Sequence, residues 1–398
     1  MGRFRDTVLV RLKRIKEGKE KFIPNPHGRM AEVFNIYKRR YILIGSNTGI
    51  GKSAFIDDTF LLRPYEWLLK QDFKYHYEVQ YYSMERTETD KYVKWLSWKV
   101  YESTGIINPS DKFQNCTQEE AEKYEAIAEK YEPWADALLD KVTVKQGPRD
   151  VEEISADIEA MAKRLCYHIK SDDQYIYVDG VKRGEFSPDK VKETNKGKIM
   201  YKTVFLSEDS RDISPNEEFW SLKLPNTFAF IIIDHIGKTK KGSEMIQKGA
   251  IDKLDAILAA ARDKYEFIPI VISQFNRAIG DFDRIRISKG DLSPILEDFK
   301  DSSNTQESAD LVIAPFDPYR YNSYDKEGNY RGYNLTPGML TPSGNCRFRS
   351  LHFLKHSNGT ANISFGMKFL GEIMHFRLLP PANSTELNKV YQEIAQGK

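Results

Sequence analysis

The sequence is poor in cysteine and has no long apolar run. Its 398 residues include three cysteines, Cys116, Cys166 and Cys346, which are far apart and odd in number. This spacing favours neither a disulfide framework nor a zinc site, and the seven histidines form no ligand-spaced pair. No apolar stretch approaches the roughly 18 residues of a membrane span, and the N-terminus lacks the apolar segment of a secretory signal. We therefore expect a cytoplasmic protein without a membrane partner.

A strong net charge is also absent. The chain has 60 Lys and Arg against 58 Asp and Glu, which gives a net charge of +2. A surface that binds nucleic acid must then be a local patch and not a global field. The hydrophobic content of 40% supports a sizeable core, and one α/β core with insertions accommodates the length.

The stretch GSNTGIGKSAF, residues 45–55, carries the clearest chemical signal. It follows RRYILI, which is typical of a buried strand, and it precedes a segment whose apolar residues have helical spacing. Strand, glycine-rich turn, Gly-Lys-Ser and helix, in that order, indicate a phosphate-binding P-loop. One position departs from the usual pattern, because Ser46 stands where the first glycine is expected and Gly45 lies one place earlier.

The P-loop predicts ATP and Mg²⁺ as cofactors. Backbone N–H groups of such a loop curl around phosphates, and the positive end of the following helix adds to the attraction. Lys52 would reach the β- and γ-phosphates, and the Ser53 hydroxyl would ligate Mg²⁺. The residues expected to bind nucleotide are Ser46, Asn47, Thr48, Gly49, Ile50, Gly51, Lys52, Ser53 and Ala54.

Later strands end in polar residues that suit a catalytic site. Residues 76–83 are expected to form a strand, which places Glu85 just beyond its carboxyl end, where α/β sheets carry catalytic groups. Residues 228–233 are almost uniformly apolar, as in a strand buried on both faces, and they end at Asp234. A carboxylate there would hold Mg²⁺ directly or through water. Another apolar strand ends at Gln274.

The alternation of strands and helices predicts an α/β fold with a doubly wound, mostly parallel central sheet and a C-terminal β-meander. We divide the chain into a basic N-terminal extension with a linker helix (1–29), a core (30–380) and a C-terminal helical tail (381–398). From about 171 to 222 the pattern changes to short β segments with polar runs, which indicates a β-rich insertion. The N-terminal helix packs either on its own domain or on a neighbouring subunit.

In order, these segments resemble the DnaB-type hexameric replicative helicases, a family of RecA-like ATPases, from about Pro24 to Leu379. GSNTGIGKS is similar to the family's Walker A motif, YYSMER to its Ser-x-Glu-Met segment and IIIDHIG to its Walker B motif. ISQFNR resembles the strand that senses the γ-phosphate, and FLKHSNG the Lys-x-Arg-Asn-Gly segment near the C-terminus. We expect no counterpart of the family's N-terminal collar domain before the core, and the insertion does not resemble a known feature of the family. Both differences are compatible with a compact phage-encoded helicase.

The resemblance implies a role for each matching residue. Glu85 would polarise the attacking water, and Gln274 would sense the γ-phosphate. Lys355 matches the lysine of the last motif and is expected to point at the γ-phosphate of the neighbouring subunit's nucleotide. Ser357 stands where the family has the arginine that reaches the neighbouring ATP site. On an unbroken strand Arg349 shares a face with Lys355 and Ser357, which makes it the candidate substitute. The alternative is that Arg349 is only a solvated residue of an edge strand.

The resemblance also implies a homo-oligomeric ring, a hexamer, that moves along single-stranded DNA and unwinds the duplex during replication. A primase or a loader is the partner expected beside it. Basic residues after the Gln274 strand would line the DNA channel, although each one alone is more often a solvated surface residue. They are Arg277, Arg284, Arg286, Lys289 and Lys300. The alternative function is a RecA-like DNA-dependent ATPase that acts as a loader or recombination mediator without unwinding.

Overall fold

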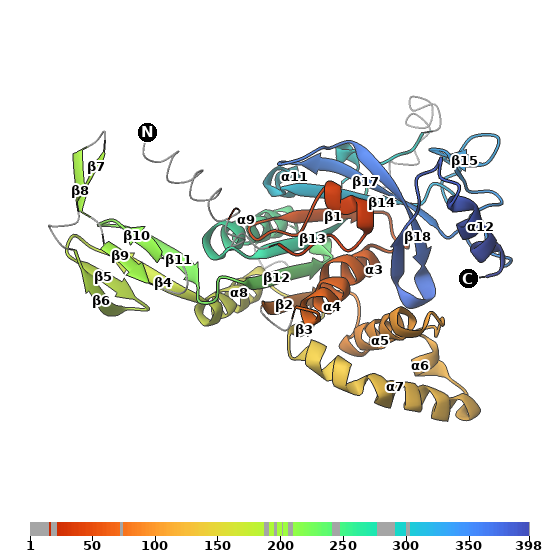
Figure 1. The fold of residues 1–398 in the computed structure, drawn as a ribbon, viewed down its shortest axis with the longest axis horizontal. Helices are drawn as coiled ribbons and strands as arrows, with labels where there is room; N and C mark the ends of the chain where they lie inside the picture. The colour runs from red at the N-terminus through yellow and green to blue at the C-terminus, as the bar shows by residue number, and fades with distance from the viewer. Residues whose placement is uncertain are drawn as a thin grey trace.

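The structure is a computed structural model that describes most of the chain. The described residues are 16, 22–71, 75–186, 191–194, 197–200, 202–205, 210–240, 247–276, 291–299 and 303–397. Within them a nine-stranded sheet forms the centre, in the order β19-β18-β17-β14-β1-β13-β12-β2-β3 (Figure 1).

The predicted α/β class, with a mostly parallel sheet and an antiparallel C-terminal meander, is confirmed. Six neighbouring strands run parallel. They are β1 (Ile42–Ser46), β2 (His76–Ser83), β3 (Val142–Gln146), β12 (Thr227–Asp234), β13 (Ile268–Gln274) and β14 (Leu311–Phe316). Three more strands continue the sheet antiparallel. They are β17 (Phe348–His356), β18 (Ile363–Leu370) and β19 (His375–Leu378).

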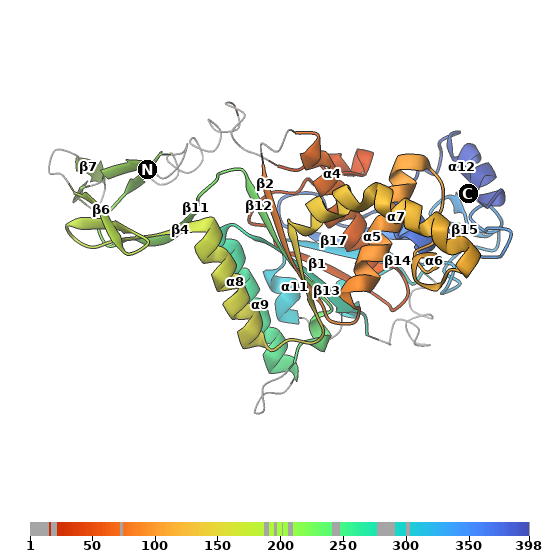
Figure 2. The ribbon, with the colours of Figure 1, turned by 90° about the horizontal axis from the view of Figure 1, so that it is seen from below.

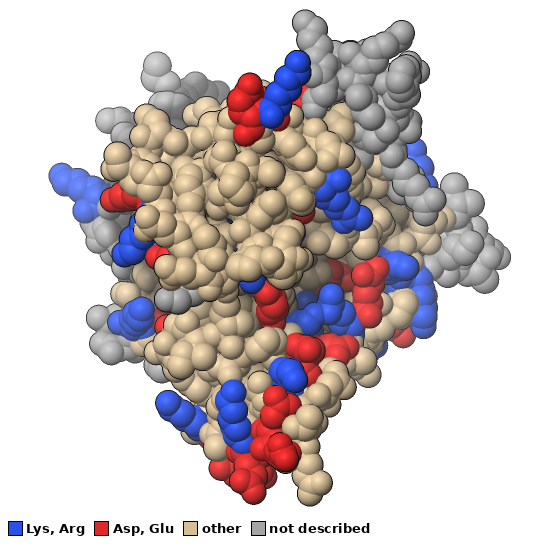
Figure 3. All heavy atoms as spheres, turned by 90° about the vertical axis from the view of Figure 1, so that its right-hand side faces the viewer, with Lys and Arg blue, Asp and Glu red and all other residues tan. Residues whose placement is uncertain are grey.

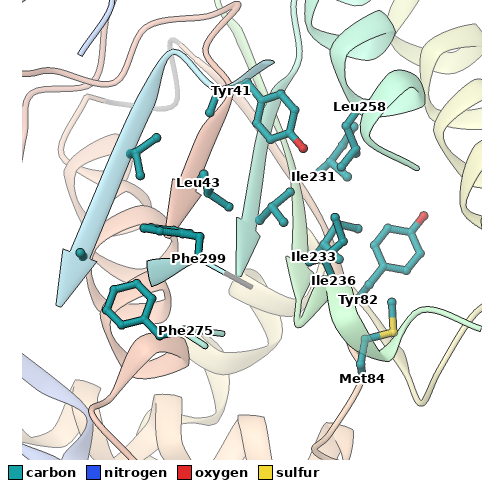
Figure 4. Close-up of a cluster of buried hydrophobic side chains, with 14 of the residues drawn as sticks. Tyr41, Leu43, Tyr82, Met84, Ile231, Ile233, Ile236, Leu258, Phe275 and Phe299 are labelled. Carbon is teal, nitrogen blue, oxygen red and sulfur yellow. The ribbon is translucent and has the colours of Figure 1, made fainter. Parts of the chain in front are cut away.

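The central strands are covered on both faces. β1, β12 and β14 are buried along their whole length, as near-continuous apolar runs predict. Successive side chains point to opposite faces of the sheet. Leu43, Ile231 and Ile233 lie on one face (Figure 4), where they belong to a cluster with α8 (Val151–Leu165) and α9 (Gln247–Tyr265). These two helices lie side by side (Figure 2).

The opposite face carries Ile44 and Ile232 and is covered by the helices that follow β1 and β2. The covering elements are α3 (Lys52–Ile56), the π-helical turn η3 (Asp57–Leu62), α4 (Arg63–Leu69), α5 (Glu88–Thr104) and α7 (Gln118–Leu139). A short helix, α6 (Lys112–Asn115), precedes α7. Helices on both faces make the sheet doubly wound. In such sheets a binding site forms from the loops at the carboxyl ends of the parallel strands.

The predicted insertion is a β-rich arm that begins at Cys166, five residues earlier than the sequence pattern indicated. Its four-stranded antiparallel sheet has the order β11-β4-β5-β6 and projects to one side of the core (Figures 1 and 2). These strands are β4 (Cys166–Ser171), β5 (Tyr175–Val178), β6 (Val181–Glu185) and β11 (Glu218–Leu222). Two hairpins complete the arm, β7 (Val191–Thr194) with β8 (Gly197–Met200), and β9 (Lys202–Phe205) with β10 (Ser210–Ile213).

Both terminal segments pack on the core where they are described. Most of the N-terminal extension, with its predicted linker helix, lies outside the described residues. From residue 22 onward the chain joins the core, because Ile23 is buried and forms a β-bridge with Ile36. The C-terminal tail forms α12 (Leu387–Ala395), which buries Val390 and Ile394. None of the described helices combines the length and the apolar character that a bilayer crossing requires.

The remaining elements are short connections. They are η2 (Gly28–Glu32), η4 (Ile236–Lys238), η6 (Leu296–Asp298), α11 (Ser303–Ser308), the two-stranded pair β15 (Asn329–Tyr330) and β16 (Tyr333–Asn334), and η7 (Gly371–Ile373). Two of them, η4 and α11, contact residues that the sequence singled out.

Candidate nucleotide-binding site

Four sequence-predicted segments meet at one edge of the sheet. β1 lies between β13 and β14, and Ser46 at its end is opposite Gln274. Asp234 at the end of β12 is opposite Ser83 at the end of β2. Because parallel strands end at the same edge, the P-loop, the segment with Glu85, Asp234 and Gln274 are brought together as expected.

The loop between β1 and α3 has the backbone shape of a phosphate cradle. Gly49 and Gly51 have φ angles of +81° and +103°, a left-handed conformation that side chains disfavour. A Cβ atom at Gly51 would lie 2.9 Å from the ring of Phe369, so only glycine fits there. Ile50 between them is buried and anchors the loop. The loop therefore presents its backbone to a ligand at the start of a helix.

Lys52 folds over this loop. Its Nζ donates hydrogen bonds of 2.9 Å to the carbonyl oxygens of Ser46 and Asn47. Burial lowers the pKa of Lys52 to about 8, while the carboxylates of Asp234 and Glu85 act in the opposite direction. The ammonium thus lies inside the loop, where it would meet the phosphates.

Ser53 and Asp234 form the second half of the site. The Ser53 hydroxyl donates to Asp234 Oδ1 at 3.0 Å. Hydroxyl and carboxylate oxygens are the ligands that Mg²⁺ prefers, and at nucleotides the ion uses one or two protein groups together with phosphates and water. The residues present therefore fit a magnesium ion that arrives with a nucleotide.

A buried lysine holds the other oxygen of Asp234. Lys91, from α5, is fully buried and donates to Asp234 Oδ2 at 3.2 Å and to Asp57 Oδ2 at 3.1 Å. It also contacts the hydroxyl of Tyr81, which donates to Asp234 Oδ2 at 3.2 Å. Trp95 adds an N–H bond to Asp57. Sequence analysis missed this cluster, although a carboxylate inside the apolar run AFIDDTFLL was a visible signal.

Gln274 ends β13 and Glu85 follows β2, the two strands that flank β12. Glu85 is half exposed, and its Oε1 lies 3.9 Å from Nζ of Lys238. Gln274 donates from Nε2 to Thr48 Oγ1 at 2.7 Å, and its Oε1 faces Nε2 of His235 at 3.3 Å. The predicted sensor therefore contacts the phosphate loop itself, whereas the predicted base stays accessible to solvent.

Solved structures of other proteins share this architecture. One of them, described as an ATPase domain, superposes with a TM-score of 0.59 at 12% sequence identity, covering 96% of this chain and all of that one. A structure of a DnaB-like replicative helicase and its interactions with primase gives 0.58 at 12% identity, over 96% of this chain and 68% of that one. The chain has the fold of a DnaB-like helicase ATPase domain. No family model and no curated protein matches it in sequence.

In this DnaB-like fold Arg349 lies under its own P-loop. Its Nη1 is 3.0 Å from Asp317 Oδ2, and its Nε donates to the carbonyl oxygen of Ile50 at 3.2 Å. The side chain is 11% exposed, and burial lowers its pKa. A guanidinium held in this way is not presented to a neighbouring subunit. The structure therefore gives no support to Arg349 as a finger acting across an interface.

A β-bulge separates Arg349 from Lys355. Val312 pairs with Lys355 and Ile313 with Phe353, so Leu354 is extra and the alternation of faces is broken. The expectation of one shared face, which assumed an unbroken strand, was wrong. Lys355 instead donates to the carbonyl oxygens of Gln306 and Glu307 near the end of α11, at 2.8 and 2.9 Å.

Lys355 and Ser357 lie at the opposite edge of the sheet from the P-loop, because β17 runs antiparallel to β14. Neither can reach the nucleotide site of its own chain. Ser357 is exposed there, and its backbone N–H bonds the carbonyl oxygen of Asp310. Contact of Lys355 with a neighbouring nucleotide stays a prediction.

Arg320 is a second cation at the P-loop that sequence analysis missed. Its Nη1 donates to the carbonyl oxygen of Thr48 at 2.6 Å. It follows β14, which is the parallel neighbour of β1, so the chain beyond Phe316 had to emerge beside the P-loop. The parallel order of the strands was the signal that could have revealed it.

The predicted DNA-contacting residues, Arg277, Arg284, Arg286, Lys289 and Lys300, lie outside the described residues. The two ends of the segment that carries most of them are described, and they meet. Phe275 and Phe299 form a bridge at the end of β13, and Asn276 N–H bonds the Asp298 carbonyl oxygen at 2.7 Å. A Cβ atom at Gly45 would collide with the Phe299 ring, which explains the glycine one place early in the loop motif.

The surface view agrees with the balanced composition. On the face drawn in Figure 3, acidic and basic side chains are intermixed and large areas carry no charge. The described residues on this face form no broad basic track of the kind that grips a DNA backbone.

Proposed function

We propose that this protein is an ATP-driven replicative DNA helicase that moves along single-stranded DNA as a ring. The observation that carries the proposal is the convergence of a P-loop, the Ser53–Asp234 pair, Glu85 and Gln274 at one edge of a DnaB-like fold. Each feature alone occurs in other proteins. Their combination is what phosphoryl transfer by a P-loop NTPase requires.

Hydrolysis would depend on positioning and electrostatics more than on covalent chemistry. The loop backbone and Lys52 bind and orient the phosphates, and Ser53 with Asp234 would hold Mg²⁺. When bound, that ion neutralises charge on the phosphates. Glu85, half exposed, accepts a hydrogen bond from the attacking water and orients it.

Two arginines would support the loop from within the same chain. Arg320 and Arg349 each donate to a P-loop carbonyl oxygen. These bonds tie the loop to the segments after β14 and at the start of β17, so they hold its backbone N–H groups in one arrangement. We assign both arginines to nucleotide binding in cis.

Assembly and partners follow by analogy with the structural neighbour. We propose a hexameric ring, single-stranded DNA in its channel and a primase or loader beside it, because a DnaB-like helicase has been solved in a study of its interactions with primase. The segment between Asn276 and Asp298 leaves the site directly after Gln274. It is therefore suited to link DNA contact to the state of the nucleotide.

A second candidate function is favoured by one observation. Arg349 is engaged in cis, and Ser357 cannot supply a cation to a neighbour. A finger donated in trans can raise the rate by roughly 10³–10⁵. A RecA-like ATPase that loads or mediates assembly on DNA without unwinding is therefore the second candidate.

A forked-duplex unwinding assay beside a DNA-stimulated ATPase assay separates the two functions. The helicase displaces the strand in an ATP-dependent manner, and Lys52→Ala, the matched control, does not. Stimulated hydrolysis without strand displacement supports the loader. Absence of hydrolysis in wild-type protein refutes both. Electron-microscopy class averages of the same preparation test for the ring.

A further inference from the structure

A continuous chain of hydrogen bonds links the end of β12 to the phosphate-binding loop. The Gly237 N–H donates to His235 Nδ1 at 3.1 Å. The proton of the neutral imidazole is then on Nε2, which donates to Gln274 Oε1 at 3.3 Å. The Gln274 amide donates in turn to Thr48 Oγ1 at 2.7 Å. In this series of three hydrogen bonds each donor has one acceptor. The direction of donation, from Gly237 through His235 and Gln274 to Thr48, is therefore defined.

Buried neighbours hold the segments that carry His235 and Gln274 in place. Ile233 and Ile236 on either side of the His235 segment are buried, and Phe275 after Gln274 is buried as well (Figure 4). A Cβ atom at Gly237 would lie 3.0 Å from His235 Cε1, so the ring packs closely on this glycine. The imidazole therefore has little freedom to turn away from Gln274.

The same segment also reaches the predicted base. Lys238, in the short helix η4, lies 3.9 Å from Glu85 through its Nζ. Residues 235–238 follow β12, which lies between β2 and β13, so they contact both the predicted base and the predicted sensor. A shift of this segment would move both groups together.

We infer that His235 is a positioning residue of the proposed ATPase, one that orients the Gln274 amide toward Thr48 in the phosphate-binding loop. An amide side chain can present either its oxygen or its NH₂ group to a neighbour. The His235 Nε2–H selects the oxygen, which leaves the NH₂ group for Thr48. Without this donor, both orientations of Gln274 become accessible and the contact with Thr48 is lost part of the time.

The test compares His235→Phe, which keeps a ring without donors, with His235→Gln, whose amide can still donate to Gln274. His235→Phe should lower kcat about three- to tenfold, the loss expected for one neutral hydrogen bond. KM for ATP and the affinity for a fluorescent ATP analogue should change less than about twofold. His235→Gln should recover most of kcat. His76→Phe is the control, since His76 begins β2 at the opposite edge of the sheet.

The same variants in a Gln274→Ala background decide whether His235 acts through Gln274. If it does, His235→Phe adds no further loss to Gln274→Ala, because the group it orients is gone. The inference is overturned if the kcat losses of His235→Phe and Gln274→Ala multiply in the double variant. It is also overturned if His235→Phe and His235→Gln lower kcat equally. A Gln274→Ala variant as active as wild type instead refutes the sensor role in the proposed function. Wild-type protein without ATPase activity refutes the function itself.

Discussion

Replacing Lys91 by methionine should destabilise the protein strongly, although Lys91 does not belong to any motif in the sequence. Its ammonium is fully buried between the carboxylates of Asp57 and Asp234, at 3.1 and 3.2 Å. Methionine fills a similar volume but removes the ammonium that both carboxylates share. Removing one partner of a buried ion pair costs about 3–5 kcal/mol.

The expected change in melting temperature follows from the size of the chain. Unfolding entropy is about 2.1 cal/mol/K per residue, which over 398 residues gives roughly 0.8 kcal/mol/K. A loss of about 3–5 kcal/mol therefore lowers Tm by about 4–6 °C. The matched control is Lys253→Met, which breaks an ion pair with Glu152 at the surface. An exposed pair contributes about 0–1 kcal/mol, so this Tm should fall by about 1 °C or less.

The loss of Tm in Lys91→Met should depend on pH in a defined direction. Burial raises the pKa of Asp57, and Lys91 acts against this rise. In Lys91→Met the pKa of Asp57 should rise further. A carboxyl whose folded pKa lies above its unfolded value gains a proton on folding, so its contribution to stability increases as pH falls. The Tm difference from wild type should therefore be larger at about pH 8 than at about pH 5.5.

Scanning calorimetry of nucleotide-free protein at both pH values measures these differences. Asp57→Asn combined with Lys91→Met should recover part of the lost Tm, because one uncompensated buried acid is removed. If Lys91→Met melts like Lys253→Met at neutral pH, the buried ion pair is not a stabilising element and the reasoning fails.

Further outcomes concern the nucleotide and DNA sites. Lys52→Ala should abolish hydrolysis and weaken ATP binding. In wild-type protein the Lys52 pKa of about 8 predicts that the lysine takes up a proton when ATP binds above about pH 8. Calorimetry in buffers of different ionisation enthalpy measures this uptake. Glu85→Gln should bind ATP yet turn over about 10²–10⁴-fold more slowly, and normal turnover excludes it as the base. Mixing Arg349→Ala with Lys52→Ala subunits should restore no activity if Arg349 acts in cis, whereas recovery would demonstrate a trans finger. A triple alanine variant should lower the slope of single-stranded DNA binding against salt by about 2, with basal ATPase retained, and an unchanged slope places the channel elsewhere. The three residues are Arg284, Arg286 and Lys289.

Much of the nucleotide site could be predicted because its signals are local in the chain. Glycines at 49 and 51 are required by backbone conformation, and Lys52 with Ser53 follows at fixed spacing. Apolar runs marked the central strands, and residues just beyond parallel strands must meet at one edge. This rule was enough to predict that Asp234 lies near Ser53, although the sequence gives no distances.

Predictions failed where a single local irregularity changed the outcome. The face shared by Arg349 and Lys355 depended on an unbroken strand, and the bulge at Leu354 turned Lys355 to the end of α11. Nothing in the sequence of β17 marks that position, since the bulge arises from pairing with β14. The insertion began earlier than expected because Cys166 pairs with Leu222, more than fifty residues away.

The sequence alone determined the α/β class, the P-loop and the strand-end positions of Glu85, Asp234 and Gln274. Each of these rests on residues that are neighbours in the chain, where spacing and backbone preference act directly. Only the tertiary structure decided that Lys91 balances Asp57 and Asp234, that Arg349 supports its own P-loop and that His235 meets Gln274. These contacts join segments from different strands and helices. Because the groups are buried, the strength of each contact depends on the geometry of the folded chain and cannot be read from the residue types alone.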